Sequence, residues 1–155
     1  MNKIRLTKRF DFEAAHSLAG YDGACKYIHG HSYTLYVTVM GTPSTDEADP
    51  KRGMVMDFGI LKYIVKESIT DRFDHCLMLR KDSPLSNEIK NEYRKVELFD
   101  FQPTCENILL YFVEILKSKL PDTVALHSLK LSETGSSFAE WYLSDQSCNS
   151  KDEAL

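Results

Sequence analysis

The stretch Ile4-Arg-Leu-Thr-Lys-Arg-Phe-Asp-Phe-Glu-Ala-Ala-His16 alternates between apolar and polar side chains. Its even positions read Ile4, Leu6, Lys8, Phe10, Phe12, Ala14 and His16. Alternation with a period of two is typical of a β-strand that buries one face. The stretch therefore predicts a strand whose apolar face is interrupted only at Lys8 and ends at His16.

A second stretch of the same kind, His29-Gly-His-Ser-Tyr-Thr-Leu-Tyr-Val-Thr-Val39, begins with two histidines. His29 and His31 are two residues apart, so they lie on the same face of a strand, and that face continues as apolar residues. If the two stretches pair as a hairpin, the end of the first lies beside the start of the second. We expect His16, His29 and His31 to converge at one end of the sheet.

Three converging histidines favour a metal site. A single histidine on an apolar face is usually a core residue with its hydrogen bonds satisfied, but three that meet at one strand end are rarely that. Neutral imidazole is the commonest ligand of zinc, and three imidazoles leave one tetrahedral position open, as in catalytic zinc sites. Cys25, four residues before His29, is then either the fourth ligand or a nucleophile or base beside the metal.

Composition indicates one soluble globular domain. The chain has 155 residues, is 43% hydrophobic and 27% charged, and carries a formal net charge of −4. These values, and the absence of a basic patch or a long apolar run, predict no nucleic-acid partner and no membrane segment. The N-terminus alternates and has no apolar signal core, and the four cysteines lack the spacing of a disulfide framework. We therefore expect reduced thiols and a cytoplasmic location.

The middle of the chain predicts two amphipathic helices. Residues 42–53 form a polar loop, and helical spacing of apolar residues over 58–71 follows Asp57, a good N-cap. Residues 80–100 are charged and aperiodic, which predicts an exposed excursion with a short helix near 86–94. A second helix is expected to begin after Thr104 as its N-cap and to end before Pro121.

Two further strands are expected over 124–133 and 137–143, and Glu133 ends the apolar face of the first of them. The order β-β-α-α-β-β predicts an α+β domain over residues 1–143, with an antiparallel sheet and two helices on one face. Residues 144–155 are predicted to be a polar, disordered tail.

The ordered motifs resemble the 6-pyruvoyl-tetrahydropterin synthase and 6-carboxy-5,6,7,8-tetrahydropterin synthase family. They are Phe12-Glu13-Ala14-Ala15-His16, Cys25 ahead of His29-Gly30-His31, Asp57-Phe58, Leu61-Lys62, Asp74-His75, Pro103-Thr104, Glu106-Asn107 and Ser132-Glu133-Thr134. The resemblance implies the tunnelling fold, ββααββ, which agrees with the element order above. It also implies a homo-oligomer, in which trimeric barrels stack as hexamers and active sites lie at subunit interfaces.

The resemblance also assigns roles to residues. The implied set is His16, His29 and His31 as Zn²⁺ ligands, Cys25 as catalytic thiol, Asp74 and His75 as the relay that reaches a thiol of an adjacent subunit, Glu133 as catalytic and pterin-anchoring carboxylate, and Thr104 and Glu106 as lining of the pterin pocket. A carboxylate suits a pterin because it can accept both a ring N–H and the exocyclic amine. From the residues alone, Asp74 could instead cap a turn and Glu133 could be an ordinary residue at a strand edge.

One spacing discriminates within the family. Three residues separate Cys25 from His29, as in the bacterial carboxy-forming enzymes, whereas the animal pyruvoyl-forming enzymes usually have five. The resemblance thus implies conversion of 7,8-dihydroneopterin triphosphate to 6-carboxy-5,6,7,8-tetrahydropterin, with release of acetaldehyde and triphosphate, on the route to queuosine. A pyruvoyl-forming lyase and a non-enzymatic zinc protein, with Cys25 closing the metal shell, stay open as alternatives. The basic residues considered for binding the triphosphate group of the substrate are Lys26 and Arg52.

Overall fold

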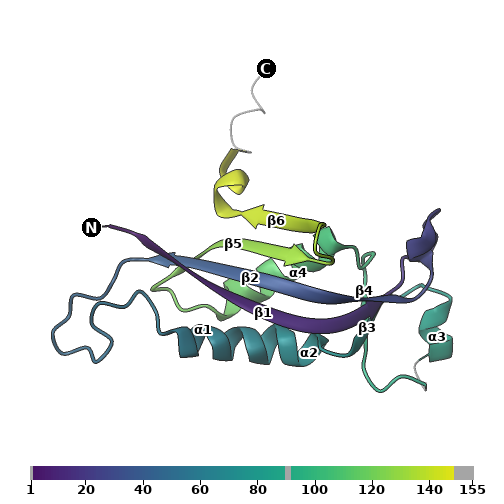
Figure 1. The fold of residues 1–155 in the computed structure, drawn as a ribbon, viewed down its shortest axis with the longest axis horizontal. Helices are drawn as coiled ribbons and strands as arrows, with labels where there is room; N and C mark the ends of the chain where they lie inside the picture. The colour runs from purple at the N-terminus through teal and green to yellow at the C-terminus, as the bar shows by residue number, and fades with distance from the viewer. Residues whose placement is uncertain (1, 90–91, 149–155) are drawn as a thin grey trace.

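The computed structural model describes residues 2–89 and 92–148 (Figure 1). A long antiparallel hairpin dominates it. Strands β1 (Ile4–His16) and β2 (His29–Gly41) pair over their whole length, from Ile4 opposite Gly41 to His16 opposite His29. This pairing confirms that the two stretches form a hairpin in which the end of the first lies beside the start of the second.

The hairpin lies inside a six-stranded sheet of order β4-β3-β1-β2-β5-β6. Strands β5 (Ala125–Ser132) and β6 (Phe138–Tyr142) extend it antiparallel from β2. On the other side, β3 (Cys76–Arg80) runs parallel to the last residues of β1, and β4 (Val96–Phe99) runs parallel to β3. The α+β class and the order of the main elements are confirmed, but the sheet is mixed and not wholly antiparallel.

The two main helical segments cover one face of this sheet (Figure 1). Helix α1 (Phe58–Val65) continues through a π-helical segment, η2 (Lys66–Thr70), into the short α2 (Asp71–Phe73), so the predicted first helix contains a π segment that its spacing did not indicate. Helix α4 (Cys105–Lys119) begins, as predicted, directly after the N-cap Thr104, whose hydroxyl accepts a hydrogen bond from the backbone N–H of Asn107 at 3.3 Å.

The core fills the space between the sheet and the helices. The buried faces of β1 and β2 meet there in a stacked pair, Phe12 and Tyr33, whose ring centroids are 5.1 Å apart. From the helix layer, Phe112 packs edge-on against Phe12 with a centroid separation of 6.1 Å. Packing against the helix layer therefore fixes the parts of β1 and β2 that lie next to the three histidines.

Residues 80–100 differ from the predicted exposed excursion. They contain α3 (Leu85–Ile89), shorter than the helix expected near 86–94, and the strand β4. Leu77 and Leu79 of β3 pack with Ile89 in a second apolar cluster. Strand β3 is apolar on both faces, as is usual for a strand with parallel neighbours. The segment around α3 packs against β3 because it buries the second of these faces.

The C-terminal part also differs. Residues 144–148, expected in a disordered tail, belong to a 3₁₀ segment, η3 (Leu143–Cys148), whereas 149–155 lie outside the described residues. Within the described ranges, no helix has the length and apolar character needed to cross a membrane. An additional 3₁₀ turn, η1 (Ala24–Lys26), links β1 to β2 near the histidines.

Candidate metal centre and active site

Three histidines meet at the closed end of the hairpin. In the register of β1 and β2, His16 lies opposite His29, and Ala14 lies opposite His31, so the three rings share one face. Their ring centroids are 4.5 to 5.1 Å apart. One nitrogen from each ring can be chosen so that the three atoms all lie within 4.8 Å of one another, which is close enough to hold one metal ion.

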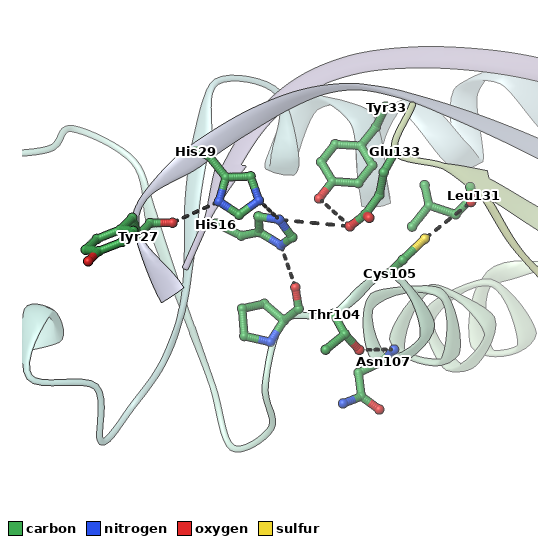
Figure 2. A network of polar contacts seen from close by, with 10 residues as sticks. His16, Tyr27, His29, Tyr33, Thr104, Cys105, Asn107, Leu131 and Glu133 are labelled. Carbon is green, nitrogen blue, oxygen red and sulfur yellow. Dashed lines mark hydrogen bonds and ion pairs between the residues drawn. The ribbon is translucent and has the colours of Figure 1, made fainter. Parts of the chain in front are cut away.

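Hydrogen bonds to backbone carbonyls fix the tautomers of two of these rings (Figure 2). Nδ1 of His16 lies 2.7 Å from the carbonyl oxygen of Pro103, and Nδ1 of His29 lies 2.8 Å from that of Tyr27. A carbonyl oxygen only accepts, so each Nδ1 carries the proton and each Nε2 keeps its lone pair. Metal-binding histidines are commonly oriented in this way.

The two Nε2 atoms lie only 3.0 Å apart. Two lone pairs at that distance repel unless a proton or a cation lies between them. Burial lowers the pKa of His16 to about 4, so this ring does not readily supply the proton at neutral pH. The donor set therefore fits a divalent cation such as zinc, which neutral imidazole nitrogens bind well.

A carboxylate borders the histidines. Glu133 follows β5, and its Oε1 lies 3.9 Å from Nε2 of His16. The hydroxyl of Tyr33, a fully buried residue, donates a hydrogen bond to the same oxygen at 3.4 Å (Figure 2). Burial and the nearby carboxylate raise the pKa of Tyr33 far above its usual value, so its hydroxyl remains a donor. Sequence reasoning missed Tyr33, although its position two residues after His31 on the same strand face placed it here.

Cys25 lies in η1, and its thiol is free and half-buried. Among the described residues, the group that could share one metal ion consists of the three histidines and does not include this sulfur. This arrangement favours an open metal position over a shell closed by Cys25. Another thiol, that of Cys105, lies near Glu133, but burial raises its pKa to about 12 and it donates to the carbonyl of Leu131. Cys105 is therefore a poor base.

Asp74 and His75 form a close pair of side chains just before β3. Nδ1 of His75 lies 3.0 Å from Oδ2 of Asp74, and the other oxygen of Asp74 accepts the backbone N–H of Glu13 at 2.9 Å. That hydrogen bond is the main reason why the pKa of Asp74 is lowered. The His75 side chain is 79% exposed, so the pair is available to solvent or to another chain, and it does not belong to the histidine cluster.

These features have counterparts in known proteins. The family model described as 6-pyruvoyl tetrahydropterin synthase matches residues 5–143. The chain belongs to the 6-pyruvoyl tetrahydropterin synthase family. A relative from Rickettsia typhi, named 6-carboxy-5,6,7,8-tetrahydropterin synthase, is 36% identical over 88% of this chain and 99% of its own length. A relative of the same name from Haemophilus influenzae is 33% identical over 89% of this chain and 98% of its own.

A solved structure also agrees. That of the 6-pyruvoyl tetrahydropterin synthase of Caenorhabditis elegans is 27% identical and superposes with a TM-score of 0.67, covering 92% of this chain and 96% of its own. The relatives and this structure therefore carry the names of two different synthases. Membership in the 6-pyruvoyl tetrahydropterin synthase family is clear, whereas the reaction has to be argued separately.

The remaining residues assigned from the resemblance to this family differ in their placement. Thr104 lies next to Pro103, whose carbonyl orients His16, so it is close to the histidines. Glu106 is exposed in the first turn of α4, and among the described residues no contact places it at the site.

The two basic residues considered as ligands of the triphosphate lie in different parts of the structure. Lys26 lies in η1 beside Cys25, with its ammonium 5.0 Å from the centroid of the Tyr27 ring. Arg52 lies in the loop after β2, at the opposite end of the hairpin, and pairs with Glu47 at 3.3 Å. The structure brings only Lys26 near the histidines of the same chain.

Replacing one ring should abolish tight metal binding. We expect the variant His31→Ala to lose most of the metal, because removal of one of three ligands should weaken affinity more than the 10- to 100-fold typical of an outer partner. The matched control is His127→Ala, since His127 lies on β5 outside the cluster. Metal content of the purified proteins, measured by mass spectrometry, checks this. Equal and near-stoichiometric metal in His31→Ala and wild type would contradict the assignment.

Proposed function

We propose that the protein is a zinc-dependent 6-carboxy-5,6,7,8-tetrahydropterin synthase. It would convert 7,8-dihydroneopterin triphosphate to 6-carboxy-5,6,7,8-tetrahydropterin, with release of acetaldehyde and triphosphate, on the route to queuosine. The observation that carries the proposal is the convergence of three histidines beside Glu133, two of which, His16 and His29, present Nε2 lone pairs to the centre of the cluster. The relatives of the same name, at 33 to 36% identity, and the three-residue gap between Cys25 and His29 favour this reaction within the family.

The metal site is assigned to His16, His29 and His31. A zinc ion held there would supply a Lewis acid that lowers the pKa of the substrate's side-chain hydroxyls. The carbonyls of Pro103 and Tyr27 orient two of the rings, so the ligand nitrogens are positioned before the metal arrives.

Glu133 is assigned to the pterin ring. Its carboxylate can accept a ring N–H and the exocyclic amine together, a bidentate contact that fixes the ring in one orientation. The donor from Tyr33 holds Oε1 on the side of the histidines, which would align the pterin with its side chain toward the metal site.

Cys25 is assigned as the base, and Asp74 and His75 as the pair that orients and moves the proton. A thiol becomes an effective base when a cation beside it favours the thiolate. The Asp74 carboxylate holds Nδ1 of His75, so Nε2 of that ring remains free to exchange a proton with a partner.

A homo-oligomer, trimeric or hexameric, completes the proposal, because Asp74 and His75 would act on the Cys25 thiol of an adjacent subunit. The sheet offers edges for such an assembly. Within the described residues, β3 covers β1 only over Ala14–His16, so residues 4–13 of β1 lack a strand partner on that side, and β6 is the opposite edge. Unpaired edges of this length readily accept strands from another chain.

A product assay distinguishes the proposal from its alternatives. Incubation of the wild-type protein with 7,8-dihydroneopterin triphosphate should yield acetaldehyde and a 6-carboxy pterin in equal amounts. Triphosphate release with a 6-pyruvoyl product and no acetaldehyde would assign the pyruvoyl-forming reaction instead. No turnover by a folded, zinc-loaded oligomer would favour a non-enzymatic zinc protein.

The assignment of Glu133 has a separate test. In Glu133→Gln one acceptor becomes a donor that faces a substrate N–H, which should cost about 2–3 kcal/mol of binding free energy. Substrate affinity should fall roughly 30- to 150-fold, with unchanged zinc content. Glu140→Gln, on the exposed part of β6, is the matched control. Calorimetric titration with a non-reactive pterin checks this, and wild-type affinity in Glu133→Gln would show that another group anchors the ring.

A further inference from the structure

The turn that joins α2 to β3 contains a strained residue. His75 has a φ of +58°, in the left-handed region, and is the only residue other than glycine with positive φ among those described. A side chain with a Cβ is unfavourable there and persists only where the surrounding contacts require it. The contacts of this turn therefore show what keeps His75 beside Asp74.

Strand β1 holds the turn from one side. The backbone N–H of His75 donates to the carbonyl of Glu13 at 2.6 Å, and the backbone N–H of Glu13 donates to the Asp74 carboxylate at 2.9 Å. The first bond fixes the N–H end of the peptide unit between Asp74 and His75, and the second ties the Asp74 side chain to the same strand.

Lys95 holds the other end of the same peptide unit. Its ammonium donates to the carbonyl of Asp74 at 2.6 Å and to that of Asp71 at 2.6 Å. Because a peptide unit is planar, a plane anchored at both its C=O and its N–H cannot rotate. The ammonium also lies at the end of α2, where a cation is favourable beside unpaired carbonyls.

The position of Lys95 is set by β4. Its own carbonyl accepts the backbone N–H of Leu77 at 3.0 Å, just before β3 and β4 pair. A second tie lies one residue pair further on, where Arg72 of α2 makes two hydrogen bonds, at 2.8 and 2.7 Å, to the carboxylate of Glu97. The ammonium is therefore supplied by a segment that is itself docked to the end of α2.

We propose that Lys95 is a positioning residue for the Asp74–His75 pair. Lys95 holds the backbone of His75 in the left-handed conformation, and this conformation keeps the His75 ring beside the Asp74 carboxylate. The catalytic part of this inference rests on the proposed role of the pair in proton transfer. Among the described residues, the hydrogen bonds of the Lys95 ammonium go to backbone carbonyls, so Lys95 acts through the pair. The role predicts a local effect at the turn and an effect on the rate of the chemical step.

The test uses Lys95→Met, which keeps the length of the side chain and removes the charge. Lys95→Arg is the conservative variant. Lys81→Met is the matched control, because Lys81 follows β3 and makes a surface ion pair with Asp100 at 2.7 Å. Amide hydrogen exchange is measured at His75 and Glu13, with Val37 in the buried centre of β2 as reference, together with zinc content, kcat and KM.

In Lys95→Met, exchange at His75 and Glu13 should rise about 10- to 100-fold, as expected for the loss of charge-assisted hydrogen bonds. Exchange at Val37 and zinc content should not change. The value of kcat should fall about tenfold or more, because misplacement of a proton-transfer group slows the chemical step, with KM within about twofold of wild type. Lys95→Arg should return exchange and kcat to within about threefold of wild type, and Lys81→Met should match wild type.

Unchanged exchange at His75 and Glu13 in Lys95→Met would overturn the proposal, whatever the activity. An equal rise at Val37 would also overturn it, because the lysine would then serve only global stability. A local rise with unchanged kcat would remove the catalytic role of Lys95. If the wild-type protein showed no turnover, the proposed function would fail, and the exchange data alone would still decide whether Lys95 holds the turn.

Discussion

The in-register pairing of β1 with β2 is the constraint on which the site depends. Side chains of a strand alternate between faces, so a slip of one residue in this register would move His29 and His31 to the opposite face from His16. The buried face makes such a slip costly, because the stacked Phe12 and Tyr33 belong to the same alternation. Core packing and the geometry of the metal site are thus specified by one pattern.

The hairpin alone does not orient the rings. Carbonyls from two different loops, those of Pro103 and Tyr27, take the Nδ1 protons and leave two Nε2 lone pairs facing each other at 3.0 Å. Two lone pairs at this distance repel unless a proton or a cation lies between them, and a metal ion bound by these rings would supply that cation. Tyr33 orients Glu133 in a similar way, because its buried hydroxyl remains protonated and donates a hydrogen bond to the carboxylate.

The sequence predicted the parts of this arrangement that follow from periodicity. The hairpin, the two main helices and the meeting of His16 with His29 and His31 all follow from residue spacing, since the strand and helix periods fix which side chains share a face. It did not predict β3, β4 or the π segment, because all three depend on neighbours distant in sequence. Residues 80–100 look exposed by their charge, yet Lys95 and Glu97 use that charge to hold the end of α2.

If His16, His29 and His31 hold zinc without Cys25, the metal keeps an open position. Zinc K-edge X-ray absorption of the zinc-loaded protein distinguishes the two ligand sets. With three histidine ligands we expect a first shell of nitrogen or oxygen atoms at about 2.0–2.1 Å, with imidazole scattering from three rings and no sulfur. A sulfur contribution at about 2.3 Å would identify Cys25 as a ligand and would rule out the open three-histidine centre.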